Sequence, residues 1–511
     1  MFHIIVDRRM EKIYKSLLST VCSAAVLLGF TACGEENKIE QVDYEISVSQ
    51  DNIEFTHRES SVVLEVITDA PSWGYTDNIS WLEIAKTVRG LSITAESNME
   101  PENREGIIML YAMTDAGEIG TRIEVKVRQD GRGAAPEGMV PFEDDTFMDW
   151  MLSYYDVNQD GYLSAEEALA VKKIYVGFDE TVEGTVPVKS LKGIEYCKNL
   201  EELECDFNAI TSLDLSGLSK LTYVDCSYNL LKEVKLTGCT SLAQYYGNVN
   251  EELESLDFKD CPNIQMIQAY KNSLRKFDAS GFEKLVYLDV SQNFITSLDI
   301  TQCPELKIVN CGTNNLETLN LKDIPALMSL GCYNNKLSSL DLSSVSELSF
   351  LECYSNSISN LDLSANKKMA TLRCDANMIE TLNIEGCLEL SSFNCSSNRI
   401  KGGMDLSAFS NLAKVNVGGN FISSLNVSGC SKITALNCSN SDLSELDVTT
   451  LVEMTELNCS SNNLKELDLS ANAKLEKVIA TKNPLEKLWL AKGQSIGDLS
   501  VDNPDVITEK E

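Results

Sequence analysis

The sequence predicts a mainly β protein, a solenoid of about fourteen 21-residue turns preceded by an immunoglobulin-like β-sandwich and a helix-loop-helix. Three observations support this. One unit rich in leucine and asparagine recurs through residues 200–490. Short stretches of alternating apolar and polar residues occupy 44–131, and a helical stretch followed by an acidic loop lies within 143–176. A chain of 511 residues also exceeds the size of one ordinary core.

The N-terminus has the features of an export signal. Lys12 and Lys15 precede an apolar stretch, 17–30, which is too short for a permanent membrane span and is followed by small residues and Cys33. The pattern resembles a bacterial lipoprotein signal. This resemblance implies that 1–32 are removed and that Cys33 carries the lipid anchor. An uncleaved anchor and a plain secretory signal are the alternatives.

Residues 33–43 are then expected to form a tether after the lipidated cysteine. Its acidic residues Glu35 and Glu36 are similar to the surface-export tags of Bacteroidota lipoproteins. The resemblance implies an outer-membrane protein exposed on the cell surface. The formal net charge of −34 over the full sequence makes nucleic acid and anionic membrane surfaces poor partners for this protein.

Residues 44–131 are expected to form a two-sheet sandwich. Strands are predicted at 60–68, 90–96, 106–113 and 121–128, because apolar and polar residues alternate there and Gly, Asn and Asp separate them. The segments around Trp73 and Trp81 and the closing residues 125–131 look like those of a BACON domain, a family with a suspected carbohydrate-binding role. Tryptophans inside strands are more often core than sugar platforms, so a spacer role is the other interpretation.

An acidic loop follows the linker 132–142 and a helical stretch that ends near residue 155. Residues 156–167 match the twelve-residue EF-hand calcium loop at each diagnostic position, with Gly161 at the sharp turn. The pattern predicts one structural Ca²⁺ site, and the alternative is a loop that only caps the next domain. The expected ligands are Asp156, Asn158, Asp160, the carbonyl of Tyr162, Ser164 and the bidentate Glu167.

The repeat unit reads L-x-x-L-x-C-x-x-N-x-L-x-x-L-x-L-S, with the asparagine recurring every 21 residues except for two steps of 22 near Glu251 and Gly402. Only Ser441 interrupts the asparagine series. The unit is identified as a leucine-rich repeat, with caps at 177–199 and 491–511. One turn cannot bury its own apolar residues, so neighbouring turns must stack. The asparagine amide is expected to satisfy backbone groups where the chain leaves the strand.

Cysteine usage follows the repeat. Val290 and Val417 replace cysteine at two strand positions, so the position requires a small hydrophobic residue rather than a thiol. Stacked strands about 4.8 Å apart are also poorly spaced for disulfides. Buried free thiols are therefore predicted for nine strand positions and six positions on the opposite side. These are 205, 226, 311, 332, 353, 374, 395, 438 and 459, then 197, 239, 261, 303, 387 and 430.

Strand residues between the inward ones should line the concave face of such a solenoid. In the first eight repeats these positions carry aromatic and acidic side chains, whereas the last six carry mostly Ser, Asn and Gly. Aromatic residues are frequent in binding surfaces, although tyrosine also simply suits β-strands. The predicted partner-binding residues are Phe207, Tyr223, Tyr228, Tyr246, Tyr270, Tyr287, Tyr333, Phe350, Tyr354, Glu204, Asp225 and Glu352.

The residue inventory argues against catalysis. The two histidines, His3 and His57, both lie outside the repeats, so the solenoid cannot build a histidine triad or a histidine–zinc site. A carboxylate pair could still hydrolyse glycosides, but a shallow repeated surface is a poor place to perturb a pKa. The predicted function is binding of a protein partner or adhesion. The alternative is glycan binding in support of polysaccharide uptake.

Overall fold

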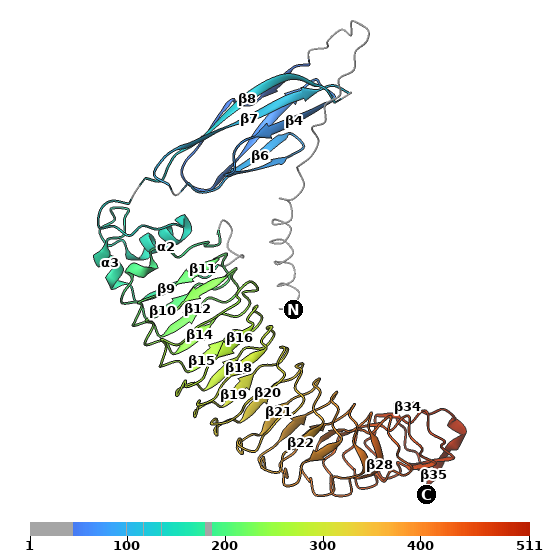
Figure 1. Ribbon diagram of the computed structural model, residues 1–511. Helices are drawn as coiled ribbons and strands as arrows, with labels where there is room; N and C mark the ends of the chain where they lie inside the picture. Colours follow the sequence, from blue (N-terminus) through green and yellow to red (C-terminus); the bar gives the residue numbers. More distant parts are fainter. Residues whose placement is uncertain (1–43, 99, 116, 134, 179–185, 511) are drawn as a thin grey trace, which may run out of the picture. The chain divides into compact units, whose positions relative to one another are not determined.

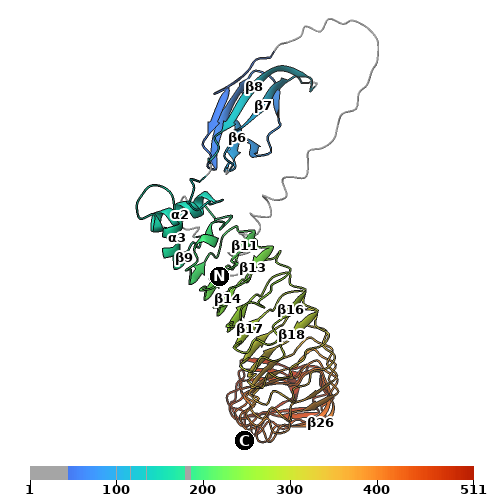
Figure 2. The ribbon, with the colours of Figure 1, turned by 60° about the vertical axis from the view of Figure 1, so that its left-hand side comes forward.

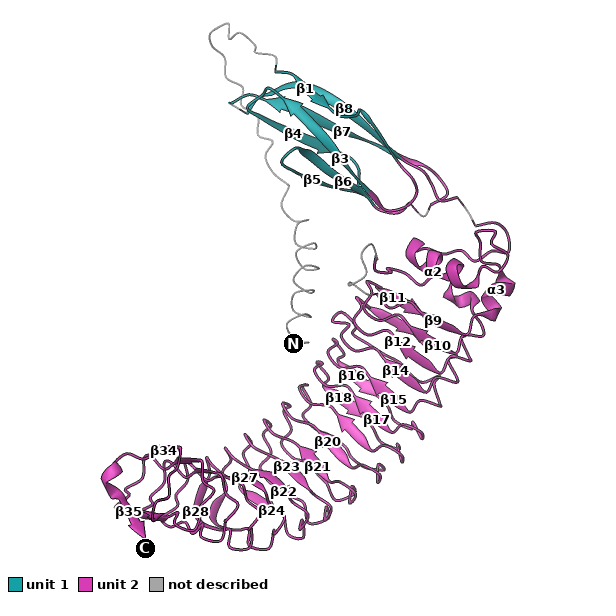
Figure 3. Ribbon diagram, turned by 180° about the vertical axis from the view of Figure 1, so that it is seen from behind, with its two compact units in different colours: residues 1–54, 61–95, 105–128 teal, residues 55–60, 96–104, 129–511 magenta. Residues whose placement is uncertain are grey.

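The computed structural model describes residues 44–510 except 99, 116, 134 and 179–185. The predicted signal 1–32, the lipidation site Cys33 and the tether therefore lie outside the described residues. Two compact units are distinguished in Figure 3: one of residues up to 54, 61–95 and 105–128, the other of 55–60, 96–104 and 129–511. In the described part of the chain, no helix has the length and apolar character needed to cross a membrane.

The first unit is built on two four-stranded sheets, as expected for a sandwich (Figure 1). Its core includes Leu64, Leu91 and Leu110, which are fully buried. One sheet has the order β1-β3-β6-β5 and the other β2-β8-β7-β4. The strands are β1 (Ile46–Val48), β2 (Asn52–Phe55), β3 (Ser60–Thr68), β4 (Ser72–Asp77), β5 (Leu82–Lys86), β6 (Gly90–Ala95), β7 (Arg104–Met113) and β8 (Ile119–Gln129).

The second unit begins its regular structure with two short helices, α2 (Asp145–Tyr155) and α3 (Ala165–Ala170). Asp144 caps α2, since its side chain accepts a hydrogen bond from the backbone N–H of Phe147. Phe147 and Leu163 are buried in the same core as the leucines of the repeats. The helix-loop-helix thus closes the first turn of the solenoid rather than forming a core of its own.

A sixteen-stranded parallel sheet, the long sheet, runs through the solenoid (Figures 1 and 2). It contains the fourteen predicted strands and one more at each end, β9 and β34. Its strands are β9 (Lys173–Tyr175), β10 (Glu202–Glu204), β12 (Tyr223–Asp225), β14 (Gln244–Tyr246), β15 (Met266–Gln268), β17 (Tyr287–Asp289), β19 (Ile308–Asn310), β20 (Ser329–Gly331), β21 (Phe350–Glu352), β23 (Thr371–Arg373), β25 (Ser392–Asn394), β27 (Lys414–Asn416), β29 (Ala435–Asn437), β30 (Glu456–Asn458), β32 (Lys477–Ile479) and β34 (Asp498–Ser500).

The other side of the solenoid has short parallel sheets. Four are pairs and the last has three strands. The strands are β11 (Ser212–Asp214) with β13 (Glu233–Lys235), β16 (Lys276–Asp278) with β18 (Ser297–Asp299), β22 (Asn360–Asp362) with β24 (Thr381–Asn383), β26 (Lys401–Asp405) with β28 (Phe421–Asn426), and β31 (Glu466–Asp468), β33 (Lys487–Ala491) and β35 (Ile507–Lys510). Two 3₁₀ turns, Ile194–Tyr196 and Pro504–Val506, complete the elements of the described residues.

The repeated asparagines form a hydrogen-bond ladder, as the sequence predicts. Asn229 is representative: its Oδ1 accepts a bond of 3.0 Å from the N–H of Ile210. Its Nδ2 donates to the carbonyl of Cys205 in the preceding turn at 2.9 Å and to the carbonyls of Cys226 and Ser227 at 3.2 Å. Each asparagine therefore ties its own turn to the one before it. Because these groups are buried, the bonds protect backbone polar atoms that water does not reach.

The residue before the asparagine adopts a left-handed backbone in turn after turn. Its φ is 53° at Phe207, 53° at Tyr228, 57° at Thr313 and 52° at Ala376, and only Gly419 uses glycine there. This conformation is unfavourable for residues with a Cβ atom. The left-handed conformation is retained at this position because it turns the backbone so that the side chain of the following asparagine enters the core.

Fifteen cysteines, all those of the repeats and their N-terminal cap, are buried and unpaired. Burial raises the pKa of the Cys226, Cys311 and Cys353 thiols to about 12, so they stay protonated at neutral pH. One strand position that lacks cysteine has a steric reason. Tyr245 points inward, and a Cβ atom built on Gly247 would lie 2.2 Å from the Tyr245 hydroxyl oxygen. Glycine makes room for the buried tyrosine.

Candidate binding face and calcium loop

The predicted partner-binding residues lie on the long sheet, where the middle residue of each strand points into the core and its neighbours point out. They occupy three columns. The first column is six residues before each asparagine, the second is four before, and the third is two or one before. All nine aromatic residues of the prediction are half-buried, and Glu204, Asp225 and Glu352 share the second column with Tyr246.

The first column is apolar at five of its seven positions from β12 to β21, with Gln244 of β14 and Ser329 of β20 as the polar exceptions. Tyr223, Tyr287 and Phe350 were predicted, and the structure adds Met266 and Ile308, with Ile308 39% exposed. The prediction missed these two because it considered only aromatic and acidic residues. Counting back from the asparagines would have found them, since they occupy the same position as Tyr223.

The third column contains stacked rings from neighbouring turns. Phe207 and Tyr228 have ring centroids 4.3 Å apart with planes 7° from parallel. Tyr333 and Tyr354 lie 4.8 Å apart at 5°. Tyr270 is adjacent to Tyr228, and burial together with the Tyr228 hydroxyl raises the pKa of Tyr270 to about 12. Aromatic rings of neighbouring turns thus form two stacked pairs in this column.

The second column is mainly polar and acidic in the same turns. Asp206, two residues before Asn208, lies in the third column next to it. Burial is the largest cause that raises the pKa of Asp206, to about 6, and the nearby carboxylates of Asp225 and Glu204 add to it. Burial and Asp225 likewise raise the pKa of Glu204. These carboxylates are thus held partly out of water and close to like charges. Perturbed groups of this kind are more common at binding and functional sites than elsewhere.

The later turns have a different surface. A shallow groove of about 340 Å³ crosses β25 to β32, and its floor contains a column of asparagines, Asn394, Asn416, Asn437 and Asn458. The Oδ1 atoms of Asn394 and Asn458 accept hydrogen bonds from the serine two residues later. The predicted difference between early and late turns is therefore present as two chemically distinct parts of one sheet.

The predicted calcium loop is ordered by hydrogen bonds to its own backbone. Oδ2 of Asp156 accepts a bond of 2.9 Å from the N–H of Gly161, and Oδ1 of Asp160 accepts one of 2.9 Å from Tyr162. Gly161 has φ 83°, a value that favours glycine. Ser164 caps α3 and forms a capping box with Glu167. Hydrogen bonds from Ser164, together with that from Val157, hold the pKa of Glu167 below its usual value.

These residues fit a hard cation. Their donor atoms are all oxygens, as Ca²⁺ prefers, and Oδ1 of Asp156 is buried with no hydrogen-bond partner in the described structure. In the described ranges, no three His, Cys, Asp or Glu side chains already converge as metal ligands. A Ca²⁺ ion would therefore have to draw Glu167 away from part of its capping box, because the same oxygens serve both purposes.

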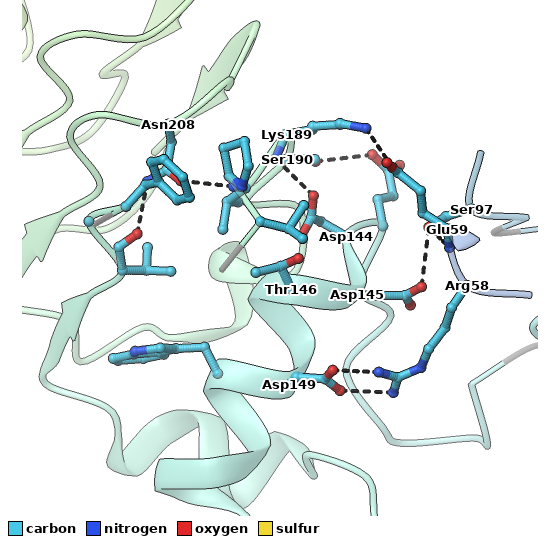
Figure 4. Close-up of a pocket in the computed structure, with 18 of the residues that line it drawn as sticks. Arg58, Glu59, Ser97, Asp144, Asp145, Thr146, Asp149, Lys189, Ser190 and Asn208 are labelled. Carbon is cyan, nitrogen blue, oxygen red and sulfur yellow. Dashed lines mark hydrogen bonds and ion pairs between the residues drawn. The ribbon is translucent and has the colours of Figure 1, made fainter. Parts of the chain in front are cut away.

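A separate pocket of about 740 Å³ lies in the second unit beside α2 (Figure 4). Its charged groups are largely paired with one another. The guanidinium of Arg58 donates two hydrogen bonds to the carboxylate of Asp149, at 2.6 and 2.9 Å. Lys189 forms an ion pair of 2.8 Å with Glu59. Because these charges satisfy each other, the long sheet is the stronger candidate for ligand binding.

Trp73 and Trp81, the two tryptophans of the first unit, are half-buried. The ammonium of Lys86 lies 4.2 Å from the centroid of the Trp73 ring, and it also donates a hydrogen bond to the Trp73 carbonyl. One face of this ring is therefore already occupied by the protein.

Comparison with known proteins identifies the fold. No protein-family model matches the chain, and no curated protein does. Among solved structures, the functional domain of InlJ from Listeria monocytogenes, described as including a cysteine ladder, matches with a TM-score of 0.56 and 23% identity, over 69% of this chain and 80% of that one. A leucine-rich-repeat protein from Leptospira interrogans gives 0.47 and 17%, over 65% and 94%. YopM from Yersinia enterocolitica gives 0.39 and 20%, over 60% and 83%.

The solenoid is therefore a leucine-rich-repeat fold. The likeness to InlJ at this identity shows the fold alone, so the function of this chain must be argued from its own surface.

Proposed function

We propose that this chain is a non-catalytic lipoprotein of the cell surface that binds a protein partner through the long sheet of its leucine-rich repeats. The observation that carries the proposal is the confinement of half-buried aromatic side chains to the first eight turns. The later turns form the same strands with mostly Ser, Asn and Gly, and no aromatic residue, at these positions. The aromatic residues are thus not needed to build the sheet.

The chemistry of this surface suits a protein ligand. Aromatic rings contribute large contact areas with little loss of side-chain entropy, and they are enriched where protein interfaces are tightest. The first and third columns supply aromatic and apolar side chains on both sides of a polar second column. This alternation of apolar and acidic groups favours a partner that carries basic residues within an apolar patch.

A glycan ligand is the second candidate, and the late turns favour it. The amides of Asn394, Asn416, Asn437 and Asn458 line the groove described above. Amides both donate and accept hydrogen bonds, as recognition of sugar hydroxyls requires. Under this alternative the protein would support polysaccharide uptake, and binding would depend on the asparagines rather than on the aromatic columns.

A retention experiment with matched variants separates these possibilities. The combined substitution Tyr223→Ser, Tyr287→Ser and Phe350→Ser removes three rings of the first column without breaking either ring stack of the third. The control is Phe294→Ser with Phe421→Ser, which removes rings 55% and 51% exposed outside the strands of the long sheet.

Proteins from cell-surface extracts that wild type and control retain should be lost from the triple variant. Equal retention by all three would reject the aromatic face. Binding on a glycan array that is lost in Asn416→Ala with Asn437→Ala, but not in the triple variant, would establish the alternative instead.

The anchor is proposed from the sequence alone. We expect the chain to incorporate labelled fatty acid at Cys33 and to be accessible to protease on intact cells. Cys33→Ser should abolish the labelling. Labelling that persists in this variant would reject lipidation at Cys33. Residues 44–131 would then act as a spacer that holds the repeats away from the membrane.

The loop 156–167 is proposed to bind one structural Ca²⁺, with Asp156, Asn158, Asp160, the Tyr162 carbonyl, Ser164 and Glu167 as ligands. Calorimetric titration of the chelator-treated protein with CaCl₂ should show one site, and Ca²⁺ should raise the thermal midpoint. Glu167→Gln should abolish both effects. Glu166→Gln, which removes the neighbouring carboxylate outside the proposed shell, should leave them intact. Equal Ca²⁺ binding by both variants would contradict the proposed ligand set.

A further inference from the structure

The long sheet contains an arginine site that its own side chain fills. Arg373 of β23 places its guanidinium carbon 4.2 Å from the ring centroid of Tyr354, the ring that stacks on Tyr333. The guanidinium lies 3.2 Å from a carboxylate oxygen of Glu352 and 3.5 Å from one of Asp375. The face thus holds arginine by a ring on one side and carboxylates at the edges.

The first two turns of the sheet present the same kinds of groups without an arginine. Phe207 and Tyr228 form the second stacked pair, Glu204 and Asp225 are paired across β10 and β12, and Asp206 directly precedes Phe207. Tyr223 faces these carboxylates, and its pKa is raised first by burial and then by Asp225 and Glu204. Across the described ranges, no ion pair within 4.0 Å reaches Glu204, Asp206 or Asp225. We use the name early cluster for Glu204, Asp206, Phe207, Tyr223, Asp225 and Tyr228.

The negative charge of Asp206 in the early cluster is costly in the unbound protein. Burial and mutual repulsion raise the pKa of Asp206 to about 6, so at neutral pH its negative charge is present in an unfavourable place. The most favourable relief is a cation that brings its own flat apolar surface. Lys173 is the cation that lowers the pKa of Glu204. Its ammonium group already forms an ion pair of 2.8 Å with Glu202.

Guanidinium meets these requirements better than the other biological cations. It is planar and weakly hydrated, it stacks on aromatic rings, and it can donate two parallel hydrogen bonds to a carboxylate. An ammonium group is more strongly hydrated and offers no flat face for a ring. A metal ion would find no set of three converging ligands among the described residues.

We infer that the early cluster, on β10, β12 and the residues that directly follow these strands, is a docking surface for an arginine side chain of the protein partner, held as Arg373 is held on Tyr354. The inference rests on the proposed function and makes it more specific, because it names the group of the partner that the first two turns recognise. The charge complementarity and the internal arginine both point to this occupant.

The test uses the full soluble chain and two defined probes, a nona-arginine and a nona-lysine peptide. We expect nona-arginine to bind at least tenfold more tightly than nona-lysine at the same ionic strength, because lysine gains the charge attraction but not the stacking. Asp206→Asn with Asp225→Asn should weaken nona-arginine binding at least tenfold. This variant should fold, because Asn394 and Asn416 already occupy the second-column position of Asp225.

The control carries the same charge change away from the long sheet. Asp278→Asn with Asp299→Asn lies on β16 and β18, where asparagine can keep the hydrogen bonds that these carboxylates accept from Ser280 and Thr301. Its affinity for nona-arginine should stay within twofold of wild type. Equal weakening of both variants, or equal binding of the two peptides, would show non-specific charge attraction and overturn the inference.

The outcome is separable from that of the retention experiment. Absence of nona-arginine binding, combined with extract proteins that wild type retains and the triple first-column variant loses, would reject the arginine site and leave the proposed function intact. If the variant Asp206→Asn with Asp225→Asn bound nona-arginine more weakly and also failed to retain the extract proteins, the arginine site and the proposed function would both be supported. If no extract protein depended on the aromatic columns, the proposed function would fall even where the peptide binds.

Discussion

Repairing the one break in the asparagine ladder should stabilise the solenoid locally. Ser441 is buried, and its hydroxyl reaches only the carbonyl of Ser439, at 3.5 Å. In the next turn, Asn462 accepts from the N–H of Leu443 at 3.1 Å and donates to three carbonyls at 2.9–3.3 Å. Ser441→Asn should recover the same four bonds, because the backbone around it repeats that of its neighbours.

The expected gain follows from these bonds. Four hydrogen bonds at ~0.5–1 kcal/mol each, less ~1 kcal/mol for ordering the longer side chain, give a stabilisation of about 2 kcal/mol. The reverse change, Asn462→Ser, should cost about 2–3 kcal/mol, because it leaves buried backbone groups without partners. A long repeat array need not unfold in one step, so the effect should be local.

Hydrogen exchange followed by mass spectrometry is the suitable assay. In Ser441→Asn, amides of the segment 417–443 should exchange about thirtyfold more slowly, since each 1.4 kcal/mol corresponds to a factor of ten. Amides of the first five turns, far from the substitution, serve as the internal reference. If amides in 417–443 exchanged at the same rate or faster, and only amides of distant turns exchanged more slowly, the role assigned to the asparagine would be refuted.

Three further predictions concern the backbone, the thiols and one carboxyl group. Ala376→Gly should raise the urea midpoint, because alanine at φ 52° costs ~1–2 kcal/mol relative to glycine. The freedom of glycine in the unfolded chain offsets part of this gain. The control Ala435→Gly, inside β29, should lower the midpoint, and a lower midpoint in both variants would contradict the argument. The fifteen described cysteines should not react with a thiol reagent at pH 8 in the native protein and should all react in guanidinium, whereas rapid native labelling would show that the strand position is accessible. Because the folded Asp206 carboxyl has a pKa raised from 3.8 to about 6, it binds a proton on folding, and its contribution to stability falls as pH rises between these values. Asp206→Asn should therefore exceed wild type in stability at pH 7.5 and match it near pH 4, and an equal difference at both pH values would contradict the shift.

The architecture of the repeats was predictable because it rests on spacing. The asparagine every 21 residues fixes the register of fourteen strands, and each amide forms the bonds expected from its chemistry. The two terminal strands were not predicted, because β9 and β34 lack the asparagine that marks the repeat. Their place in the sheet depends on pairing with Leu203 and Val478, a tertiary effect that a repeat pattern does not contain.

The binding face was predictable by position but not by contact. Counting from the asparagines places Tyr354 and Glu352 on the surface, yet it does not reveal that Arg373 lies between them. That arrangement depends on side-chain rotamers from turns 21 residues apart. Gly247 illustrates the same limit, since its absence of a side chain is explained only when Tyr245 is seen to fill the space.

The asparagine ladder also makes the length of this protein adjustable in whole turns. Each asparagine bonds only within its own turn and to the turn before, so removal of one complete 21-residue unit joins two ends that already fit. An extra single residue is accommodated within the short pair β26–β28, where the pairing register shifts between Gly402 and Gly403. A gene could therefore gain or lose repeats by recombination and move the aromatic and asparagine regions closer or farther apart in steps of one strand, ~4.8 Å. The distance between two contacts on a partner can thus be matched without redesign of either surface.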